Sequence, residues 1–223
     1  MRIGQVRSLS LRAERHAPPL GVERAVALAG QGFAGDVHAD PVSPRQLLLA
    51  SSAVYASLGL PAHTLRENLL VDIDTARLTS GTILQLGAAV RIRLMFQCEA
   101  CGQLDLQRPG LARALGERRG MLARVVAGGT VVAGDAIVQL DQRLPPWLDD
   151  WRARVTAVLD AAPSGTVVEY AQLARLAGIQ SSYCRAFPRL LAKLGPQYAN
   201  RAAAARSGSN APRWNGSGLF DLP

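Results

Sequence analysis

The chain has 223 residues and a formal net charge of +8, with 48% apolar and 19% charged residues, which is typical of a globular protein of one large or two modest domains. No run of about 18 apolar residues is present, so we expect no membrane-spanning helix and no membrane partner. The N-terminus lacks an apolar segment with a cleavage site, and three cysteines are an odd number, so we expect a cytoplasmic protein with reduced thiols.

The first 142 residues are dominated by short β-branched or alternating runs separated by Gly, Asp and Ser. These runs predict strands at 1–11, 24–30, 46–51, 68–73, 82–87, 89–96, 122–128 and 130–140. Residues 51–59 and 110–120 have helical spacing instead. Many short strands without regular βαβ alternation favour a β-rich, barrel-like core with a few helices.

Pro145 and Pro146 end the strand pattern, and a different pattern begins at Trp147. Residues 146–163, 168–178 and 181–195 predict three short helices. The apolar side of the first helix is expected to contain Trp147, Leu148, Trp151, Val155, Val158 and Leu159. We therefore predict two domains, a β-rich one over 1–142 and a small α-helical one over 145–223.

Positive charge gathers in the C-terminal part of the chain. Of the 25 basic residues 24 are arginine, and between Tyr170 and Phe220 there are seven basic residues and no acidic one. Such a field attracts phosphate, which makes nucleic acid a candidate partner.

Cys98 and Cys101 lie three positions apart in "FQCEACGQLD", directly after a predicted strand. Structural zinc requires about four Cys or His ligands, whereas Cys184 is distant and the three histidines are scattered, so we expect no structural zinc. A redox pair, two packed side chains and a single working thiolate remain open.

Residues 1–142 resemble the MOSC domain, which is named after the C-terminal domain of molybdenum-cofactor sulfurases. The shared pieces occur in the family's order: "GFAGDVHAD", "PRQLLLAS", "RENLLVDI", "LTSGTILQLGAAVRI", a cysteine in "CGQL", and "GGTVVAGDAIVQL". The resemblance implies a small strand-rich barrel. It also implies a cysteine that holds sulfur as a persulfide or contacts the molybdenum cofactor (molybdopterin).

The resemblance places this role on Cys101, as nucleophile and as molybdenum ligand if the metal is bound, with Cys98 as a resolving, accessory or merely packed thiol. Arg91 and Arg93 could favour the thiolate if they face the cysteines. The family has prolines and an arginine before its cysteine. This chain has "FQCEA" there, which puts a shared substrate in doubt.

Other cofactor contacts follow from the same resemblance, each with a structural alternative. His38 can ligate, shuttle a proton or only bond its turn. Asn68 can contact a ligand or cap a strand, and the guanidinium of Arg45 suits phosphate or a pterin ring. The expected cofactor-binding residues are Asp36, His38, Arg45, Gln46, Glu67 and Asn68.

Residues 158–191 resemble the DNA-binding domain of O6-alkylguanine-DNA alkyltransferases and their alkyltransferase-like relatives, which implies a winged-helix-like module. Tyr170 matches the family's tyrosine, and Arg185 matches the arginine that replaces an extruded base. The acceptor cysteine and its histidine are replaced by Ala199 and Asn200, so no alkyl transfer is expected. The expected nucleic-acid-binding residues are Tyr170, Arg185, Arg189, Arg201 and Arg206.

Two classes of function compete. In the first, the protein is a sulfur carrier or a molybdenum-cofactor-dependent reductase of N-hydroxylated compounds or modified bases, with a sulfur donor or electron-transfer protein as partner. In the second, it is a non-enzymatic DNA-binding protein that recognises damaged or modified bases. A hybrid would use the helical domain to present a modified base to the barrel.

Overall fold

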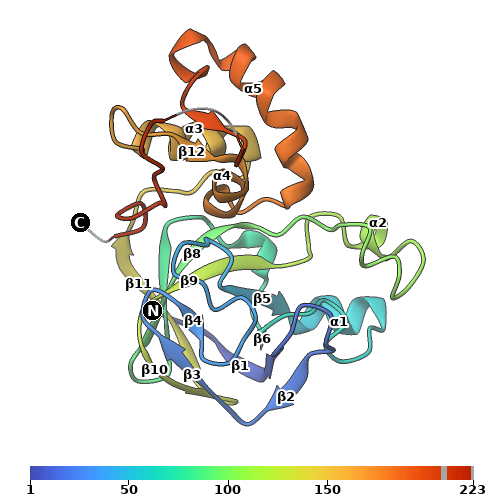
Figure 1. Ribbon diagram of the computed structural model, residues 1–223. Helices are drawn as coiled ribbons and strands as arrows, with labels where there is room; N and C mark the ends of the chain where they lie inside the picture. Colours follow the sequence, from blue (N-terminus) through green and yellow to red (C-terminus); the bar gives the residue numbers. More distant parts are fainter. Residues whose placement is uncertain (207–209, 222–223) are drawn as a thin grey trace. The chain divides into compact units, whose positions relative to one another are not determined.

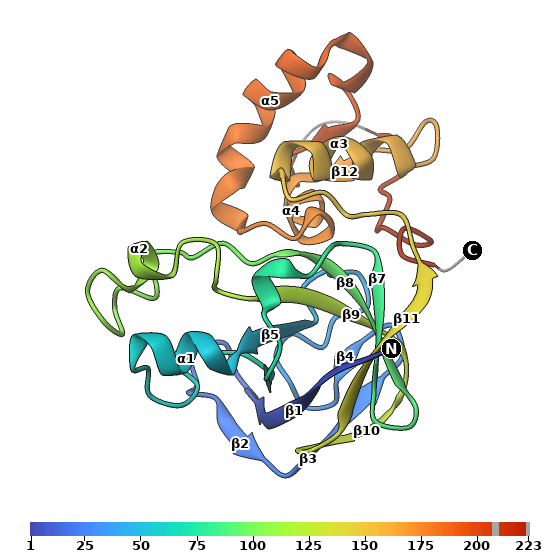
Figure 2. The same cartoon turned by 180° about the vertical axis from the view of Figure 1, so that it is seen from behind.

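The computed structural model describes residues 1–206 and 210–221, and the chain divides into two compact units. The barrel unit comprises Met1–Pro41 and Arg45–Trp147, and the helical unit comprises Leu148–Pro223 with Val42–Pro44. Figures 1 and 2 show both units from opposite sides.

The barrel unit is a β-barrel of seven strands. Its main sheet has the order β11-β7-β8-β9-β5-β6-β1-β2, and the pairing of β11 with β1 closes the ring, so that β2 only extends one end of β1. A second sheet has the order β10-β3-β4. The strands are β1 (Arg2–Leu11), β2 (Leu20–Val22), β3 (Arg24–Leu28), β4 (Gly32–Phe33), β5 (Leu47–Ser51), β6 (Leu69–Val71), β7 (Thr82–Leu86), β8 (Val90–Gln97), β9 (Met121–Ala127), β10 (Gly129–Val132) and β11 (Ala136–Arg143).

Strand β5 is buried on both of its faces. Leu47 and Leu49 point into the barrel core, whereas Ala50 belongs to a second apolar cluster outside the ring. This outer cluster is formed by α1 (Ser52–Leu58), α2 (Leu111–Leu115) and the loops beside them. The short 3₁₀ helix η1 (Thr75–Arg77) completes the unit.

The expected β-rich barrel with a few helices is confirmed, with small differences at element ends. The run 130–140 contains two strands, β10 and β11, separated by a turn at Gly134, whose φ is +93°. The helix expected over 110–120 ends at Leu115, because Gly116 adopts a φ of +54° and breaks the α-conformation. The two- and three-residue strands β4 and β2 were not predicted.

The helical unit contains α3 (Trp151–Ala161), α4 (Tyr170–Ala177) and α5 (Phe187–Leu194), with two short strands β12 (Val168–Glu169) and β13 (Ala202–Ala203) that pair in parallel. Two 3₁₀ helices, η2 (Ser181–Ala186) and η3 (Pro196–Tyr198), flank α5. The third predicted helix, 181–195, is therefore two elements. Pro188 explains the break, because proline lacks an amide hydrogen and is tolerated only in the first turn of a helix.

The apolar side predicted for α3 is only partly correct. Val155, Val158 and Leu159 are fully buried, but Leu148 precedes the helix and is 49% exposed. Trp147 belongs to the barrel unit, where its backbone exchanges hydrogen bonds with the Ser80 hydroxyl. The prolines before Trp147 let the chain leave the barrel in extended form, so the helical spacing there was coincidental.

A winged helix is not shown. The tip of the expected wing, residues 207–209, lies outside the described residues, and the strand that precedes it is the two-residue β13. Within the part of the chain that the structure describes, no helix is long and apolar enough to cross a membrane.

The chain reversal between α2 and β9 depends on a glycine. Gly120 has a φ of +138°, and a Cβ added there would lie 2.1 Å from the carbonyl oxygen of Leu49. We expect Gly120→Ala to lower the free energy of unfolding by on the order of 3 kcal/mol, measured by urea denaturation. Gly110→Ala is the matched control, since its φ of +77° is also positive but its Cβ would meet nothing within 4 Å, and it should cost about 1 kcal/mol. Equal losses would contradict this packing argument.

Candidate functional site

A pocket of about 110 Å³ lies in the barrel unit, and its lining is strongly cationic. Its apolar part is formed by Leu47, Leu48 and Leu122. Its polar part is formed by Arg12, His38, Arg45, Arg66, Asn68, Cys98, Gln103 and Arg119. Four guanidinium groups and a thiol around one small space fit an anionic or sulfur-bearing ligand.

One edge of the pocket is organised by the carboxylate of Asp36, whose side chain is fully buried. Its Oδ1 accepts hydrogen bonds from the backbone N and the ring Nδ1 of His38, at 2.9 and 3.0 Å. Its Oδ2 accepts from the backbone N of Arg12 and from Nδ2 of Asn68, both at 2.9 Å. Burial raises the pKa of Asp36, but the hydrogen bonds from His38 and Arg12 outweigh burial, and the pKa lies below its ordinary value.

These contacts determine the tautomer of His38. The guanidinium of Arg12 can only donate, and its Nη2 lies 2.8 Å from Nε2 of His38, so Nε2 is the acceptor. Nδ1 then carries the proton that it donates to Asp36. His38 is therefore held in a fixed orientation between Asp36 and Arg12, which lines the same pocket.

The "RENL" loop supplies the next residues of the pocket edge. Arg66 has a φ of +61°, uncommon for a residue with a side chain, and its guanidinium donates to the carbonyls of Arg15 and Ala17 at 3.2 and 3.0 Å. Oδ1 of Asn68 accepts from the Leu48 backbone N at 3.0 Å. Asn68 thus lines the pocket and also ties β5 to the Asp36 edge.

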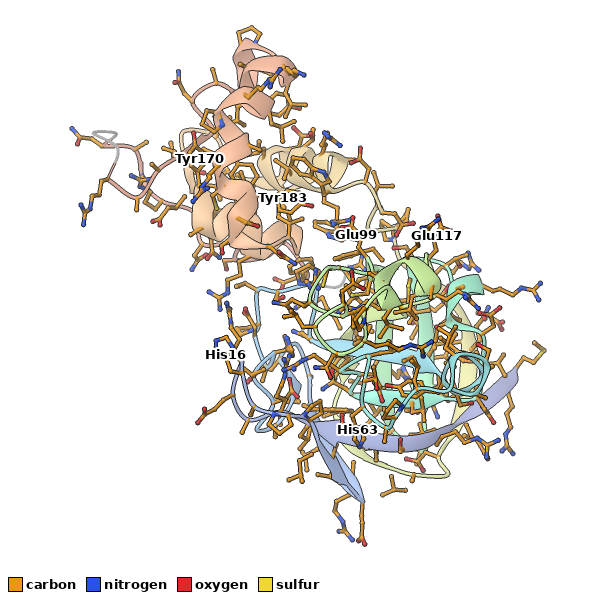
Figure 3. All side chains as sticks on the ribbon, turned by 90° about the vertical axis from the view of Figure 1, so that its right-hand side faces the viewer. His16, His63, Glu99, Glu117, Tyr170 and Tyr183 are labelled. Carbon is orange, nitrogen blue, oxygen red and sulfur yellow. The ribbon has the colours of Figure 1, made fainter. Side chains whose placement is uncertain are left out.

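Glu67 does not line the pocket. Its Oε2 accepts a hydrogen bond of 2.5 Å from the Tyr55 hydroxyl, and its Oε1 lies 3.6 Å from Nδ1 of His63. Burial raises the pKa of Glu67, and burial together with Glu67 raises the pKa of Tyr55. His63 also has a positive φ, of 60°, so this buried cluster holds the loop that presents Arg66 and Asn68. Figure 3 shows that His63 and His16 lie well apart in the barrel unit.

Gln46 is fully buried and its amide bonds three backbone groups. Nε2 donates to the carbonyls of Gly30 and Asp40 at 2.6 and 2.8 Å, and Oε1 accepts from the Val125 backbone N at 2.9 Å. Its neighbour Arg45 does line the pocket. The pair "RQ" therefore points one side chain at the pocket and the other at the supporting loops.

Cys98 lines the pocket directly and is 2% exposed. Nη2 of Arg45 lies 3.8 Å from its sulfur. The backbone N of Cys98 donates to the carbonyl of Gly120 at 2.8 Å, which fixes the start of the cysteine loop against the end of the α2–β9 connection.

Cys101 is half-buried, and its sulfur accepts a hydrogen bond of 3.2 Å from Nη1 of Arg119. The same Nη1 donates to the carbonyl of Glu99 at 2.7 Å, so Arg119 spans the cysteine loop. Nε of Arg119 is buried and has no hydrogen-bond partner in the structure. Arg119 therefore places a cationic hydrogen-bond donor against the sulfur of Cys101.

The arginines near the cysteines are not the ones expected. Arg91 is exposed on β8, and Nη2 of Arg93 donates to the carbonyl of Pro145 at 2.7 Å. Arg45 and Arg119 contact the two sulfurs instead. Arg12, Arg66 and Arg119 were missed as site residues. Arg66 is the first residue of the quoted "RENLLVDI" motif, Arg12 follows the first predicted strand, and Arg119 precedes Gly120.

Among residues 1–206 and 210–221, no three His, Cys, Asp or Glu side chains gather in a way that could hold a metal ion. The thiols of Cys98, Cys101 and Cys184 are free in the structure.

The residues expected to bind nucleic acid have different surroundings. Arg185, Arg189 and Arg206 are exposed. The ring of Tyr170 packs edge-on against Phe187 at 5.5 Å, whereas Arg201 donates to the carbonyls of Leu159 and Ala162, both at 2.6 Å. Arg201 therefore stabilises the helical unit from inside. Figure 3 labels Tyr170 and Tyr183 in this unit, where Tyr183 packs edge-on against Trp151 at 5.0 Å.

Other solved structures share the fold of this chain. YuaD protein from Bacillus subtilis matches 61% of this chain and 96% of its own, at 16% identity and a TM-score of 0.53. YiiM from Geobacillus stearothermophilus matches 85% of this chain and all of its own, at 16% identity and a TM-score of 0.52. A solved structure described as a hypothetical protein matches 90% of this chain and 97% of its own, at 19% identity and a TM-score of 0.54.

Residues 36–138 match the MOSC domain family, so the chain contains a MOSC domain. No curated protein matches the chain. The comparisons give no support to the expected likeness of residues 145–223 to alkyltransferases. Since the helical unit makes up about a third of the chain, the YiiM match also includes part of that unit, which shows a similar fold there and nothing about its chemistry.

The geometry of Asp36 predicts a pH-dependent stability. Its folded-state pKa lies below the unfolded value of 3.8, so its stabilising contribution is present above that pH and is lost as the pH falls through the folded value. We expect Asp36→Asn to lower the free energy of unfolding by about 2 kcal/mol at pH 7, and by less near pH 3. Urea denaturation at both pH values measures this. The exposed Asp141→Asn is the control and should change stability by less than about 0.5 kcal/mol. A deficit of Asp36→Asn that is the same at both pH values would contradict the argument.

Proposed function

We propose that the barrel unit is a cysteine-thiolate protein of the sulfur–molybdenum type, in which Cys101 carries a persulfide or ligates molybdenum. One observation supports this proposal above the others. Both cysteines of one loop contact a guanidinium group that lines the pocket, Cys98 with Arg45 and Cys101 with Arg119. Mere packing would account for burial of the sulfurs but not for two charged partners.

The molybdenum cofactor fits this donor set. Its pterin bears a phosphate, and Arg12, Arg45, Arg66 and Arg119 supply fixed cationic donors, one of them with a buried Nε that has no partner. The pocket volume of about 110 Å³ is smaller than the roughly 300 Å³ of a typical cofactor site. The pocket therefore suits the phosphate group of the cofactor, and the rest of the cofactor would lie outside it. When bound, the cofactor supplies two-electron redox chemistry at molybdenum. The chain's own residues orient the anion and hold the thiolate of Cys101.

For the substrate we propose N-hydroxylated compounds, among them modified bases, which such a centre reduces. The support is the MOSC domain itself, and the reaction requires an electron-transfer partner. In a sulfur carrier the corresponding partner is a persulfide donor.

Molybdenum and pterin analysis tests this proposal. In protein from a host that makes the cofactor, we expect wild type to retain molybdenum, and Cys101→Ser to lose at least 90% of it with unchanged circular dichroism. Arg119→Gln should retain several-fold less molybdenum than wild type, because the substitution removes a hydrogen-bond donor to both the anion and the thiolate. Arg91→Gln, exposed on β8, is the matched control and should behave as wild type. Wild type that retains neither molybdenum nor a persulfide would overturn the proposal.

A second candidate function rests on the exposed face of η2 and α5. Arg185, Arg189 and Lys193 recur every four residues and are all exposed. The opposite side of α5 buries Phe187, Leu190 and Leu191 against the unit. Residues four apart share one face of an α-helix, so Arg189 and Lys193 of α5 form a positive surface that phosphates can approach, and Arg185 precedes it in η2.

We therefore propose that the helical unit contacts DNA, as a module arranged like the DNA-binding domain of alkyltransferases. Arg185 would fill the space of an extruded base, while Arg189 and Arg206 neutralise phosphates. Ala199 stands where that family has its acceptor cysteine, so methylated guanine stays unrepaired. Nη2 of Arg201 bonds carbonyls inside the unit and so contributes to its fold.

Duplex DNA binding at several salt concentrations tests the second candidate. If about five phosphates are neutralised, the log–log slope should be about −4 to −5. Arg185→Ala should weaken binding most for mismatched or modified bases, and Arg206→Ala should weaken all duplexes alike by a smaller factor. Arg91→Ala, on the barrel, serves as the control for total charge. DNA binding that is undetectable at low salt, or that does not depend on salt, would exclude this function.

A further inference from the structure

The two cysteines of the barrel occupy different positions relative to the pocket. Cys98 lines it and is 2% exposed, so solvent-borne reagents have little access to its sulfur except through the pocket. Cys101 is half-buried and does not belong to the lining. The thiol that the MOSC resemblance identifies as reactive is therefore the outer one, and the thiol that faces a bound ligand is the inner one.

Each of the two sulfurs contacts a guanidinium group that would stabilise its thiolate during a sulfur transfer between the two cysteines. Nη1 of Arg119 donates to the sulfur of Cys101 at 3.2 Å, which stabilises a thiolate that leaves there. Nη2 of Arg45 lies 3.8 Å from the sulfur of Cys98, which stabilises a thiolate that attacks from there. The three-residue separation is the one that allows two cysteines of a loop to react with each other.

We propose that Cys98 and Cys101 form a sulfur relay, in which Cys101 receives sulfane sulfur from a persulfide donor and Cys98 presents it inside the pocket. This inference rests on the proposed function, because it requires a persulfide on Cys101. In the loading step a donor R–S–SH transfers its terminal sulfur to Cys101, and the donor departs as the thiol R–SH. The relay thus gives Cys98 a catalytic role rather than a packing one.

The transfer step balances without an oxidant. The thiolate of Cys98 attacks the terminal sulfur of the Cys101 persulfide, a new S–S bond forms at Cys98, and the old S–S bond breaks. Cys101 leaves as a thiolate beside Arg119, and the proton that Cys98 has lost returns to Cys101. One sulfur atom moves inward, and no electrons are gained or lost overall.

The probe is glutathione persulfide labelled with heavy sulfur, applied to the full chain. Glu99 lies between the two cysteines, so cleavage after glutamate separates them into different peptides for mass spectrometry. In wild type we expect the label first on Cys101 and then on Cys98, as the Cys101 signal falls. In Cys98→Ser, or Cys98→Ala as a second variant, the label should stay on Cys101 at the wild-type loading rate. In Cys101→Ser, labelling of Cys98 should be at least tenfold slower.

Three outcomes would overturn the relay alone. They are label that stays on Cys101 in wild type, labelling of Cys98 in Cys101→Ser at the wild-type rate, and a Cys98–Cys101 disulfide with release of one sulfide. Absence of label from both cysteines would count against sulfur carriage itself, and the relay would fall with it. Arg45→Gln adds a second readout, since it should slow the appearance of label on Cys98 several-fold without changing the loading of Cys101.

Discussion

The buried carboxylate of Asp36 is the interaction on which one edge of the pocket depends. A buried charge is tolerated only when hydrogen bonds replace the lost water, and Asp36 obtains four of them from three separate segments of the chain. Satisfying this one carboxylate therefore fixes the end of β1, the "GDVH" turn and the "RENL" loop relative to one another. Arg12 and Asn68 reach the pocket as a result.

The other edge has the opposite electrostatic character. Four guanidinium groups line the same pocket, and burial, followed by the neighbouring charges of Arg66 and Arg119, lowers the pKa of Arg12 even though Asp36 opposes this. Like charges held together raise the free energy of the empty site, and a bound anion would offset that cost. Arg66 in a left-handed conformation adds backbone strain in the same place. Such arrangements are more typical of ligand sites than of structural cores.

The sequence predicts the barrel well, because the alternation of apolar and polar residues, as in the start of β8, indicates a strand locally, although most of β8 is buried on both faces. It predicts α5 less well, because Pro188 converts one expected helix into two elements. In the site, the motifs contain Asp36, His38, Arg45 and Asn68, which the structure places in or beside one pocket. They do not reveal that Gln46 and Glu67 point away from it. Arg119 joins the cysteine loop only through folding, so no local pattern could indicate its contact with Cys101.

The cysteine pair shows how structure and resemblance answer different parts of one question. Sequence motifs single out Cys101, because they record which position carries the family's cysteine. The fold places Cys98 in the pocket lining, and its backbone N–H bonds the carbonyl of Gly120. If only Cys101 mattered, the pocket would face an inert thiol beside Arg45. If only Cys98 took part in the function, the contact between Arg119 and Cys101 would have no functional role. A function that uses both thiols in sequence accounts for both guanidinium contacts at once.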